Sequence, residues 1–156
     1  MLDIKILQKK DPETIAKLNR VVQERHRELF RNSFKEFNYD SILEAVESLL
    51  KKNEYWSFIA YLDEVPIGYA IVFKRKFEEN PFRNSYTALV IDQMCVITEF
   101  QHQGVGSQLV SEVRDFAEKM GVDKLELTVW SKNKEARSFY HRIGFNTLME
   151  YMRMEI

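Results

Sequence analysis

The chain is poor in the residues that break a backbone or cross-link it. Of its 156 residues, five are glycine, three are proline and one is cysteine, Cys95. A single cysteine excludes an internal disulfide and fits a reducing compartment. No apolar run approaches the roughly 18 residues of a membrane helix, and the N-terminal stretch MLDIKILQKKD is too short and too interrupted for a signal peptide. These absences predict a cytoplasmic protein without a membrane span.

An excess of charge of either sign is also lacking. The formal net charge is −1 at pH 7, so neither nucleic acid nor an anionic membrane is expected as a partner. The three histidines and one cysteine form no cluster with metal-ligand spacing, so no metal is expected. No repeat, low-complexity stretch or flexible linker divides the chain, and 45% of the residues are hydrophobic. Residues 1–156 are therefore predicted to form a single domain with its own core.

Hydrophobic spacing predicts a mixed order of strands and helices. Asp11 and Pro12 suit the start of a helix that runs to about Phe30, and Ser41 with Glu44 is typical of a capping box for a second helix. Strands are expected over 2–7, 85–97 and 125–130, and one or two more within 145–156. The segment 55–77 is expected to form two strands joined by a turn at 63–66. Further helices are expected over 104–120 and 133–143. This order predicts an α/β (α+β) domain with a mixed sheet flanked by helices.

Two of the five glycines, Gly104 and Gly106, lie where a strand region gives way to a helix. No acidic residue occurs between Gln101 and Glu112, although the first turn of a helix usually favours one. Unpaired N–H groups at a helix start, approached closely past a glycine, can bind a phosphate or pyrophosphate. The alternative is a tight turn whose glycines only adopt positive φ.

The residues after Gly106 exclude two common phosphate-binding motifs. A P-loop requires Lys followed by Ser or Thr, where this chain has Ser107-Gln108. A dinucleotide fingerprint requires a small residue where this chain has Leu109. The pattern that fits is Gln/Arg-x-x-Gly-x-Gly/Ala, and the stretch QHQGVG at 101–106 resembles the pyrophosphate arm of the GNAT superfamily, the acetyl-CoA-dependent N-acetyltransferases.

Three further stretches strengthen this resemblance. MCV at 94–96 is similar to the family's strand that pairs with the pantetheine arm, DEVPIGYAIV at 63–72 to a family hairpin, and NKEARSFYHRIGF at 133–145 to a second motif. The resemblance covers most of the chain from about Ile4 and is strongest over 90–145. It implies a largely antiparallel sheet of six to seven strands with about four helices. It also implies a splay between the strand that holds MCV and the strand that follows it.

The resemblance implies which residues hold the co-substrate acetyl-CoA. Backbone amides of the glycine loop are expected to bind the pyrophosphate, and backbone groups of Met94 and Val96 the pantetheine arm. Asn133 is expected to contact the cofactor arm, although asparagine is also a common helix cap. Arg137 is expected to reach a phosphate, although charged helix faces are usually only solvated. The full set is Met94, Val96, Gln101, His102, Gln103, Gly104, Val105, Gly106, Ser107, Asn133, Arg137 and Tyr140.

Two residues are expected to be catalytic. Tyr140 stands at the family's general-acid position, where a phenol of pKa about 10 can return a proton to a leaving thiol of pKa about 8.5; the alternative is a packing aromatic. The incoming amine must lose a proton. Strand alternation would place residues 90, 92 and 94 on one face, which in relatives faces the acceptor, so Asp92 is the expected base. The alternatives are Glu99 as base, or a structural Asp92.

The acceptor is expected near the region between the first two helices. The aromatic residues there either pack under a loop or line an acceptor pocket; they are Phe30, Phe34, Phe37 and Tyr39. The acidic residues that would receive a cationic amine are Glu28, Glu36, Asp40 and Asp92.

The implied activity is direct transfer of an acetyl group from acetyl-CoA to a primary amine of a small molecule or peptide, by a monomer or a homodimer. Two alternatives on the same fold are a non-catalytic CoA-binding regulatory module and a transferase for a longer acyl-CoA.

Overall fold

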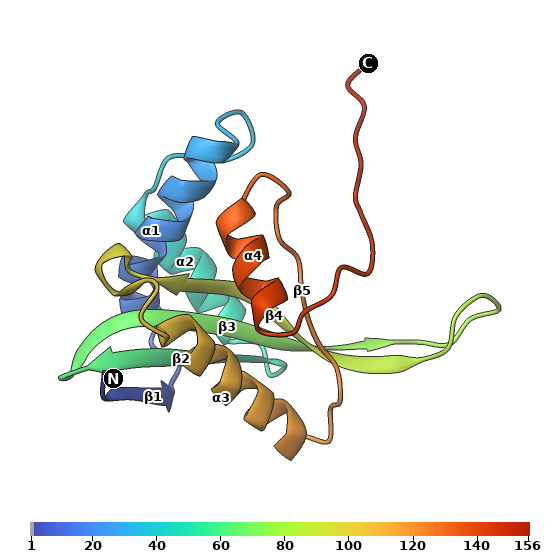
Figure 1. Ribbon diagram of the computed structural model, residues 1–156, viewed down its shortest axis with the longest axis horizontal. Helices are drawn as coiled ribbons and strands as arrows, with labels where there is room; N and C mark the ends of the chain where they lie inside the picture. The colour runs from blue at the N-terminus through green and yellow to red at the C-terminus, as the bar shows by residue number, and fades with distance from the viewer. Residues whose placement is uncertain (1) are drawn as a thin grey trace.

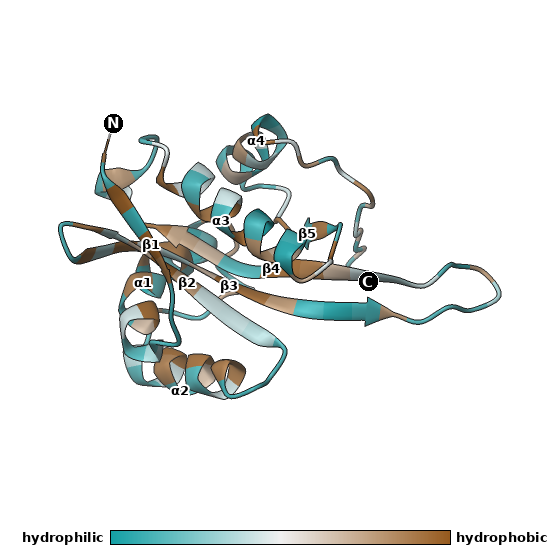
Figure 2. Ribbon diagram, turned by 90° about the horizontal axis from the view of Figure 1, so that it is seen from below, coloured by the Kyte–Doolittle hydropathy of each residue, from teal (hydrophilic) through white to brown (hydrophobic). Residues whose placement is uncertain are grey.

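A computed structural model describes residues 2–156 as one five-stranded sheet with helices on both faces. Helices α1 and α2 cover one face, and α3 and α4 the other (Figures 1 and 2). The elements are β1 (Ile4–Gln8), α1 (Pro12–Leu29), α2 (Tyr39–Leu50), β2 (Tyr55–Leu62), β3 (Val65–Phe77), β4 (Tyr86–Val96), the 3-10 turn η1 (Thr98–Phe100), α3 (Val105–Lys119), β5 (Leu125–Leu127) and α4 (Lys134–Arg142). Across the described residues, no helix combines the length and apolar character needed to cross a membrane.

The sheet is mixed, as predicted. The strands lie in the order β1-β2-β3-β4-β5, antiparallel from β1 to β4, while β5 runs parallel to β4. A parallel neighbour requires a crossover connection, and α3 supplies it. The mixed α/β class and the four helices are confirmed, with five strands in residues 2–156 instead of six to seven.

Two strand predictions near the C-terminus were wrong. Strand β5 has three residues instead of the six at 125–130, and no strand forms within 145–156. Alternating side chains favour an extended backbone, but a strand also needs a neighbour that pairs with its N–H and C=O groups. Among residues 2–156 the only strand beside β5 is β4, which it meets over Leu89–Ile91.

The helix ends follow the polar residues and glycines around them. The Asp11 side chain accepts a hydrogen bond from the Thr14 amide at 3.1 Å and caps α1, with Pro12 in the first turn as predicted. The cap of α2 is Asn38 instead of Ser41, since its side chain accepts from the Ser41 amide at 2.9 Å. Asparagine caps a helix as well as serine does, so the helix begins earlier than the capping-box pattern predicted.

The core lies in two layers, one on each face of the sheet. Residues such as Leu89, Leu109 and Val113 are fully buried between the sheet and α3. Ile15 of α1 is equally buried against Tyr69 of β3 on the other face, and other residues of α1 and α2 join this layer. The sheet is therefore held rigidly from both sides, and its strand ends are fixed platforms for functional groups.

Gly68 of β3 allows β4 to approach closely. A Cβ at this position would lie 2.8 Å from the backbone oxygen of Cys95, which cannot move without shifting β4. We expect Gly68→Ala to lower the free energy of unfolding by about 1–3 kcal/mol, the usual range for overpacking. A decrease in Tm of several degrees in calorimetry would show it. The control is Gly121→Asn, because Gly121 has a φ of +70° and open space around its Cβ position, and asparagine tolerates that conformation.

Candidate active site

Strand β4 has an open edge over its last residues. Strand β5 pairs with β4 only at Leu89–Ile91, so the rest of β4 has no strand on that side. The Ile97 amide donates to the Ile67 oxygen at 2.9 Å, which directs the backbone of Ile97 toward β3. Since successive residues of a strand direct their backbone groups to opposite sides, those of Met94 and Val96 face away from β3. They lie along the opening between β4 and β5, where an extended ligand can form strand-like hydrogen bonds.

A β-bulge at Asp92 corrects the predicted alternation along β4. Gln93 pairs with Ile71 and Ile91 pairs with Val72, so Asp92 is an extra residue without a partner on β3. Beyond a bulge the alternation shifts by one residue. Met94 therefore packs with Leu89 and Ile91 in the α3-side core layer. Simple alternation predicted that Met94 and Asp92 share a face of the sheet, and this prediction is wrong.

Asp92 lies on the face of the sheet that carries α1 and α2. Its charge acts on the hydroxyls of Tyr55 and Tyr69, both of which belong to the α1–α2 side. Burial raises the pKa of Asp92 above its ordinary value, while a hydrogen bond with Gln93 and the charge of Lys52 act in the opposite direction. The side chain still reaches solvent. A carboxyl group in this position can exchange protons with a ligand that arrives from the α1–α2 face.

The start of α3 presents free backbone N–H groups without a side-chain cap. Gly104 takes the cap position with φ +87°, no side chain caps the helix, and no acidic residue lies in its first turn. The first intrahelical bond runs from the Gln108 amide to the Gly104 oxygen at 3.0 Å. The preceding amides of Val105, Gly106 and Ser107 are thus left for a ligand. Together with the helix dipole, they form a site suited to an anion.

The two glycines of this loop have different roles. Gly104 has nothing within 4 Å of its Cβ position and is required for its positive φ. Gly106 has no positive φ, but a Cβ there would lie 3.1 Å from the ring of Phe139. Gly106 therefore allows α4 to pack against the start of α3. The prediction that both glycines open the backbone to an anion is incomplete, because Gly106 also lets Phe139 approach.

Side chains of the loop hold its backbone in place. Gln101 donates from Nε2 to the Val96 oxygen at 2.9 Å, and Gln103 donates from Nε2 to the Glu99 oxygen at 2.8 Å. His102, at φ +59°, places Nε2 2.9 Å from a carboxylate oxygen of Glu135 in the first turn of α4. The predicted loop is thus fixed to both β4 and α4, and its backbone amides remain available.

Asn133 and Arg137 both make contacts within the chain. The Asn133 side chain accepts from the Ala136 amide at 3.3 Å, so the helix-cap role is confirmed. Arg137 donates to the Ser131 oxygen at 3.3 Å. Both residues lie at the α4 end that the His102–Glu135 pair joins to the glycine loop, so they stand beside the expected cofactor site while also ordering the 131–137 turn.

Tyr140 lies in α4 among aromatic rings. Its ring centroid is 5.1 Å from that of Phe139 and 5.6 Å from that of Phe145, both in edge-on geometry. Burial raises the pKa of Tyr140 to about 12. The hydroxyl therefore keeps its proton throughout the neutral range. Within the described residues no hydrogen bond joins Tyr140 to Asp92. Tyr140 belongs to α4, which covers one face of the sheet, whereas the charge of Asp92 acts on tyrosines of the α1–α2 face.

A buried polar network beside Asp92 was missed at the sequence level. The amide of Asn19 in α1 donates to the Tyr69 hydroxyl at 2.9 Å, and that hydroxyl donates to Gln93 Oε1 at 3.1 Å. Asn19 is 6% exposed, and its Oδ1 has no partner among the described residues. The available signal was an asparagine next to Leu18 in the apolar stripe of α1. The network fixes Gln93, the residue next to the bulge.

An aromatic cluster joins the α1–α2 loop to the β5–α4 loop. The Trp130 ring lies 4.8 Å from that of Phe30 and 5.1 Å from that of Phe34, and the His26 ring lies 4.7 Å from that of Phe34 at a tilted angle. Phe37 lies under the Arg20 guanidinium instead. The predicted aromatic residues therefore belong to neither buried core layer. The sequence did not identify Trp130, which is 45% exposed, as their partner.

Two of the four acidic residues expected to receive an amine are already paired. Glu28 pairs with Arg25 at 3.3 Å and Glu36 with Arg27 at 3.1 Å. These pairs satisfy the carboxylates with cations from the same chain. Asp92, at the bulge, is the acidic residue of that set whose environment favours proton exchange.

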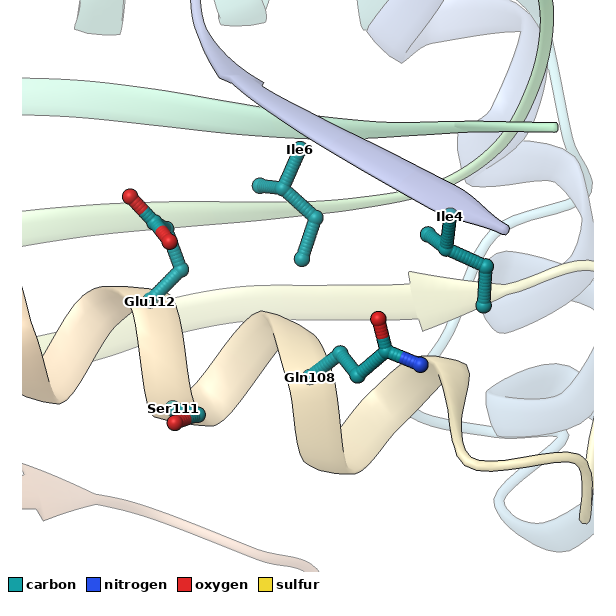
Figure 3. Close-up of a pocket in the computed structure, with 5 residues that line it drawn as sticks. All are labelled: Ile4, Ile6, Gln108, Ser111 and Glu112. Carbon is teal, nitrogen blue, oxygen red and sulfur yellow. The ribbon is translucent and has the colours of Figure 1, made fainter. Parts of the chain in front are cut away.

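Two hollows on the surface can be compared with the expected site, and one expected acceptor residue, Glu28, lines the second of them. One, of about 240 Å³, opens between β1 and α3 (Figure 3) and is lined by Ile4, Ile6, Gln108, Ser111 and Glu112. The other, of about 470 Å³, lies along α1 and is lined by Glu24, Arg27, Glu28 and Arg31. The expected cofactor-binding residues line neither of them. The candidate cofactor site consists of the open edge of β4 and the start of α3.

The fold has close counterparts among solved structures. A tetramutant of the BH1408 protein from Bacillus halodurans superposes with a TM-score of 0.89 at 19% identity, covering 97% of this chain and 99% of that one. The aminoglycoside N-acetyltransferase AAC(6')-Iy in complex with CoA superposes with a TM-score of 0.72 at 20% identity, covering 100% and 95%. At these identities the likeness shows the fold alone.

Sequence comparison gives the family. An uncharacterised N-acetyltransferase of Methanocaldococcus jannaschii is 28% identical over 105 residues, which are 62% of this chain and 42% of the relative. The chain spans less than two thirds of the length of the curated relatives it matches. Residues 19–145 match the acetyltransferase (GNAT) family, and this segment includes the bulged strand, the glycine loop and α4. The chain therefore belongs to the acetyltransferase (GNAT) family.

Proposed function

We propose that the chain is an N-acetyltransferase that transfers an acetyl group from acetyl-CoA directly to a primary amine of a small molecule or peptide. The observation that carries the proposal is the open edge of β4 beside the uncapped start of α3. The edge of β4 suits an extended ligand arm that contains amide groups, and the start of α3 suits a pyrophosphate. A GNAT neighbour crystallised with CoA supports this assignment of the ligand.

The residues present fit acetyl-CoA. The amides of Val105, Gly106 and Ser107 would hold the pyrophosphate, with Gly104 setting the turn. The backbone groups of Met94 and the N–H group of Val96 would pair with the pantetheine arm, in place of the strand that β5 does not supply. Gln101, which already holds the Val96 oxygen, would keep the loop and the strand edge in register. When bound, acetyl-CoA supplies the activated acetyl group as a thioester.

The proton transfers divide between the two faces of the sheet. Asp92, on the α1–α2 face, would take the proton that the attacking amine must lose. Tyr140, protonated at neutral pH, would donate its hydroxyl proton to the departing sulfur. In this proposal the base acts on the side of the acceptor and the acid acts on the side of the cofactor. The pantetheine opening at the end of β4 lies between them.

The acceptor is proposed to be a small cationic amine that enters near Asp92 and the cluster of Phe30, Phe34 and Trp130. The AAC(6')-Iy neighbour, an aminoglycoside N-acetyltransferase, supports a small-molecule acceptor. The alternatives are a peptide amine, a longer acyl-CoA, and a non-catalytic CoA-binding module. Aromatic rings bind cations when these come within about 6 Å of the ring, which gives the cluster a role in acceptor recognition.

A thermal-shift titration tests the binding site first. We expect acetyl-CoA and CoA to raise the Tm of the chain, because both bind the folded state only. Ser107→Glu places a carboxylate in the first turn of α3, where it repels a pyrophosphate but favours the unliganded helix. We therefore expect this variant to keep its own Tm and to lose at least tenfold in acetyl-CoA affinity.

The matched control and the activity assay complete this test. Ser85→Glu makes the same change at an exposed residue before β4 and should bind acetyl-CoA normally. Free-thiol release is then measured over aminoglycosides, polyamines, amino acids and peptide N-termini. Thiol release with one amine class supports the enzyme and identifies its acceptor, whereas an unchanged Tm with every acyl-CoA contradicts the proposed site.

A further inference from the structure

Asp92 and Gln93 are adjacent residues whose side chains lie on the same face of the sheet. Gln93 accepts a hydrogen bond from the Tyr69 hydroxyl, which belongs to the α1–α2 layer, and the charge of Asp92 acts on the same hydroxyl. The next residue, Met94, packs in the α3-side layer. Adjacent strand residues ordinarily point to opposite faces, and the bulge at Asp92 removes this alternation for one step. The bulge thereby places an amide side chain next to the carboxyl group that we propose as the base.

The hydrogen bonds that reach Gln93 all end on its amide oxygen. Asn19 Nδ2 donates to the Tyr69 hydroxyl at 2.9 Å and to Gln93 Oε1 at 3.4 Å. The Tyr69 hydroxyl, which accepts from Asn19, donates its own proton to Gln93 Oε1 at 3.1 Å. Gln93 Oε1 therefore receives two hydrogen bonds and is held on the side of α1. The two N–H groups of Gln93 Nε2 lie on the other side of the planar amide, where they can donate to an acceptor.

The Asp92 carboxylate is the acceptor beside that amide nitrogen. Burial raises the pKa of Asp92, and a hydrogen bond with the Gln93 side chain acts in the opposite direction because it stabilises the charged form. The reverse orientation of the amide would take Oε1 away from the Tyr69 hydroxyl and turn it toward the carboxylate, where two acceptors repel each other. The network and the carboxylate therefore favour the same orientation of Gln93.

The donors that orient Gln93 are themselves buried. Tyr69 is fully buried between the sheet and the helices, and Asn19 is 6% exposed. We propose that Gln93 is a positioning residue: Asn19 and Tyr69 hold its amide oxygen, and its amide nitrogen holds the Asp92 carboxylate in place on the α1–α2 face. This inference rests on the proposed role of Asp92 as the base that takes the proton of the acceptor amine.

Asp92 is the group of this region that changes its charge below neutral pH. The titratable groups that act on it or on the network come from β2, β3, β4 and the residues after α2; they are Lys52, Tyr55, Tyr69 and Cys95. Burial raises the pKa of both tyrosines and raises that of Cys95 to about 12, so all three keep their protons at neutral pH. Lys52 keeps its positive charge there, and α1 contributes Asn19, which does not titrate. An acidic titration on this face therefore reports on Asp92.

Replacing Gln93 with methionine tests the inference. The variant keeps an unbranched side chain but removes the amide, so burial of Asp92 is no longer opposed by that hydrogen bond. We expect the pKa of Asp92 to rise, and the acidic limb of the kcat/KM profile to move to higher pH with it. The first is measured by NMR titration of the side-chain carboxyl carbon of Asp92, a signal assigned by its loss in Asp92→Asn. The second is measured by thiol release with an amine acceptor.

Tyr69→Phe is the second variant, and it leaves Gln93 in place. It removes the hydroxyl that donates at 3.1 Å, so the Gln93 amide is held only by the longer bond from Asn19. We expect the same direction of shift, and a decrease in kcat/KM of up to about 100-fold, the cost of misplacing a reacting group by about 1 Å. Circular dichroism checks that both variants are folded, and this variant decides if Gln93→Met is not.

Cys95→Ala is the matched control. Cys95 lies on the same strand and the same face, is 5% exposed, and donates from Sγ to the Leu18 oxygen at 3.3 Å. Its replacement disturbs the same core layer but should leave the Asp92 titration and the acidic limb at their wild-type pH.

Three results would count against these assignments. An Asp92 titration that is unchanged in the folded variants of Gln93 and Tyr69 overturns the inference. A shifted titration without a shifted acidic limb also overturns it, because the reaction then does not use that carboxyl group. An absence of thiol release with every amine would instead contradict the proposed function. The NMR titration requires no turnover, so it would then decide alone whether Gln93 holds the carboxylate.

Discussion

Replacing Tyr140 with phenylalanine is expected to lower kcat about 10²–10⁴-fold, the range for loss of a positioned acid–base group. The ring lies edge-on to Phe139 and Phe145, and those contacts remain in the variant because only the hydroxyl is removed. Binding of acetyl-CoA through the glycine loop and the β4 edge should therefore be unchanged. Stopped-flow measurement of thiol release, with a parallel binding titration, checks both parts.

The pH dependence sharpens this prediction. Burial raises the pKa of Tyr140 to about 12, so the hydroxyl is protonated up to that pH and is lost as a donor only above it. The wild-type profile should then show no fall in kcat from this residue between pH 7 and 10. Tyr55→Phe, which removes a hydroxyl near Asp92, is the control on the other face of the sheet. An unchanged kcat in Tyr140→Phe, with normal acetyl-CoA binding, would assign the general acid to another group.

The glycine loop was predictable because its determinants are local. A glycine at a helix start, an absent acidic first turn and the spacing of Gln101 to Gly106 all lie within a few residues of one another. The structure confirms the strand-loop-helix arrangement there and the position of α4. What sequence did not reveal was that Gly106 makes room for Phe139, since that contact joins residues 33 positions apart.

The errors arose where the outcome depends on long-range pairing. The bulge at Asp92 is defined by which residue of β3 faces which residue of β4, and strand alternation alone carries no such register. Residues 145–156 have a strand-like pattern, but they pair with no strand among the described residues. Trp130 was expected in a strand, but β5 ends at Leu127. The Trp130 ring instead contacts aromatic residues about 100 positions away in the sequence.

Replacing Asp92 with asparagine is expected to lower kcat/KM about 10²–10⁴-fold at neutral pH and to remove the acidic limb of its pH profile. Because burial raises the pKa of this carboxyl, the wild-type limb should lie above the ordinary aspartate value of about 3.9. The rate rises with pH as the carboxyl loses its proton and becomes a base. Asp92→Glu keeps a carboxyl group, so its pH profile should retain an acidic limb while its kcat/KM is reduced.

The Asp92→Asn substitution should lower activity at neutral pH but should not lower stability, so an effect on catalysis can be told from an effect on folding. A carboxyl whose pKa is raised in the folded state binds its proton more tightly there, so the wild-type protein gains stability as pH falls through that pKa. At neutral pH its charge is partly desolvated, and asparagine removes this cost. We therefore expect Asp92→Asn to have an equal or higher Tm at pH 7 and to lack the gain at low pH. As a control, Asp115→Asn at an exposed position should alter neither the pH profile of kcat/KM nor that of Tm. An acidic limb that persists in Asp92→Asn would assign the base to another group, and Glu99 would then be the next residue to replace.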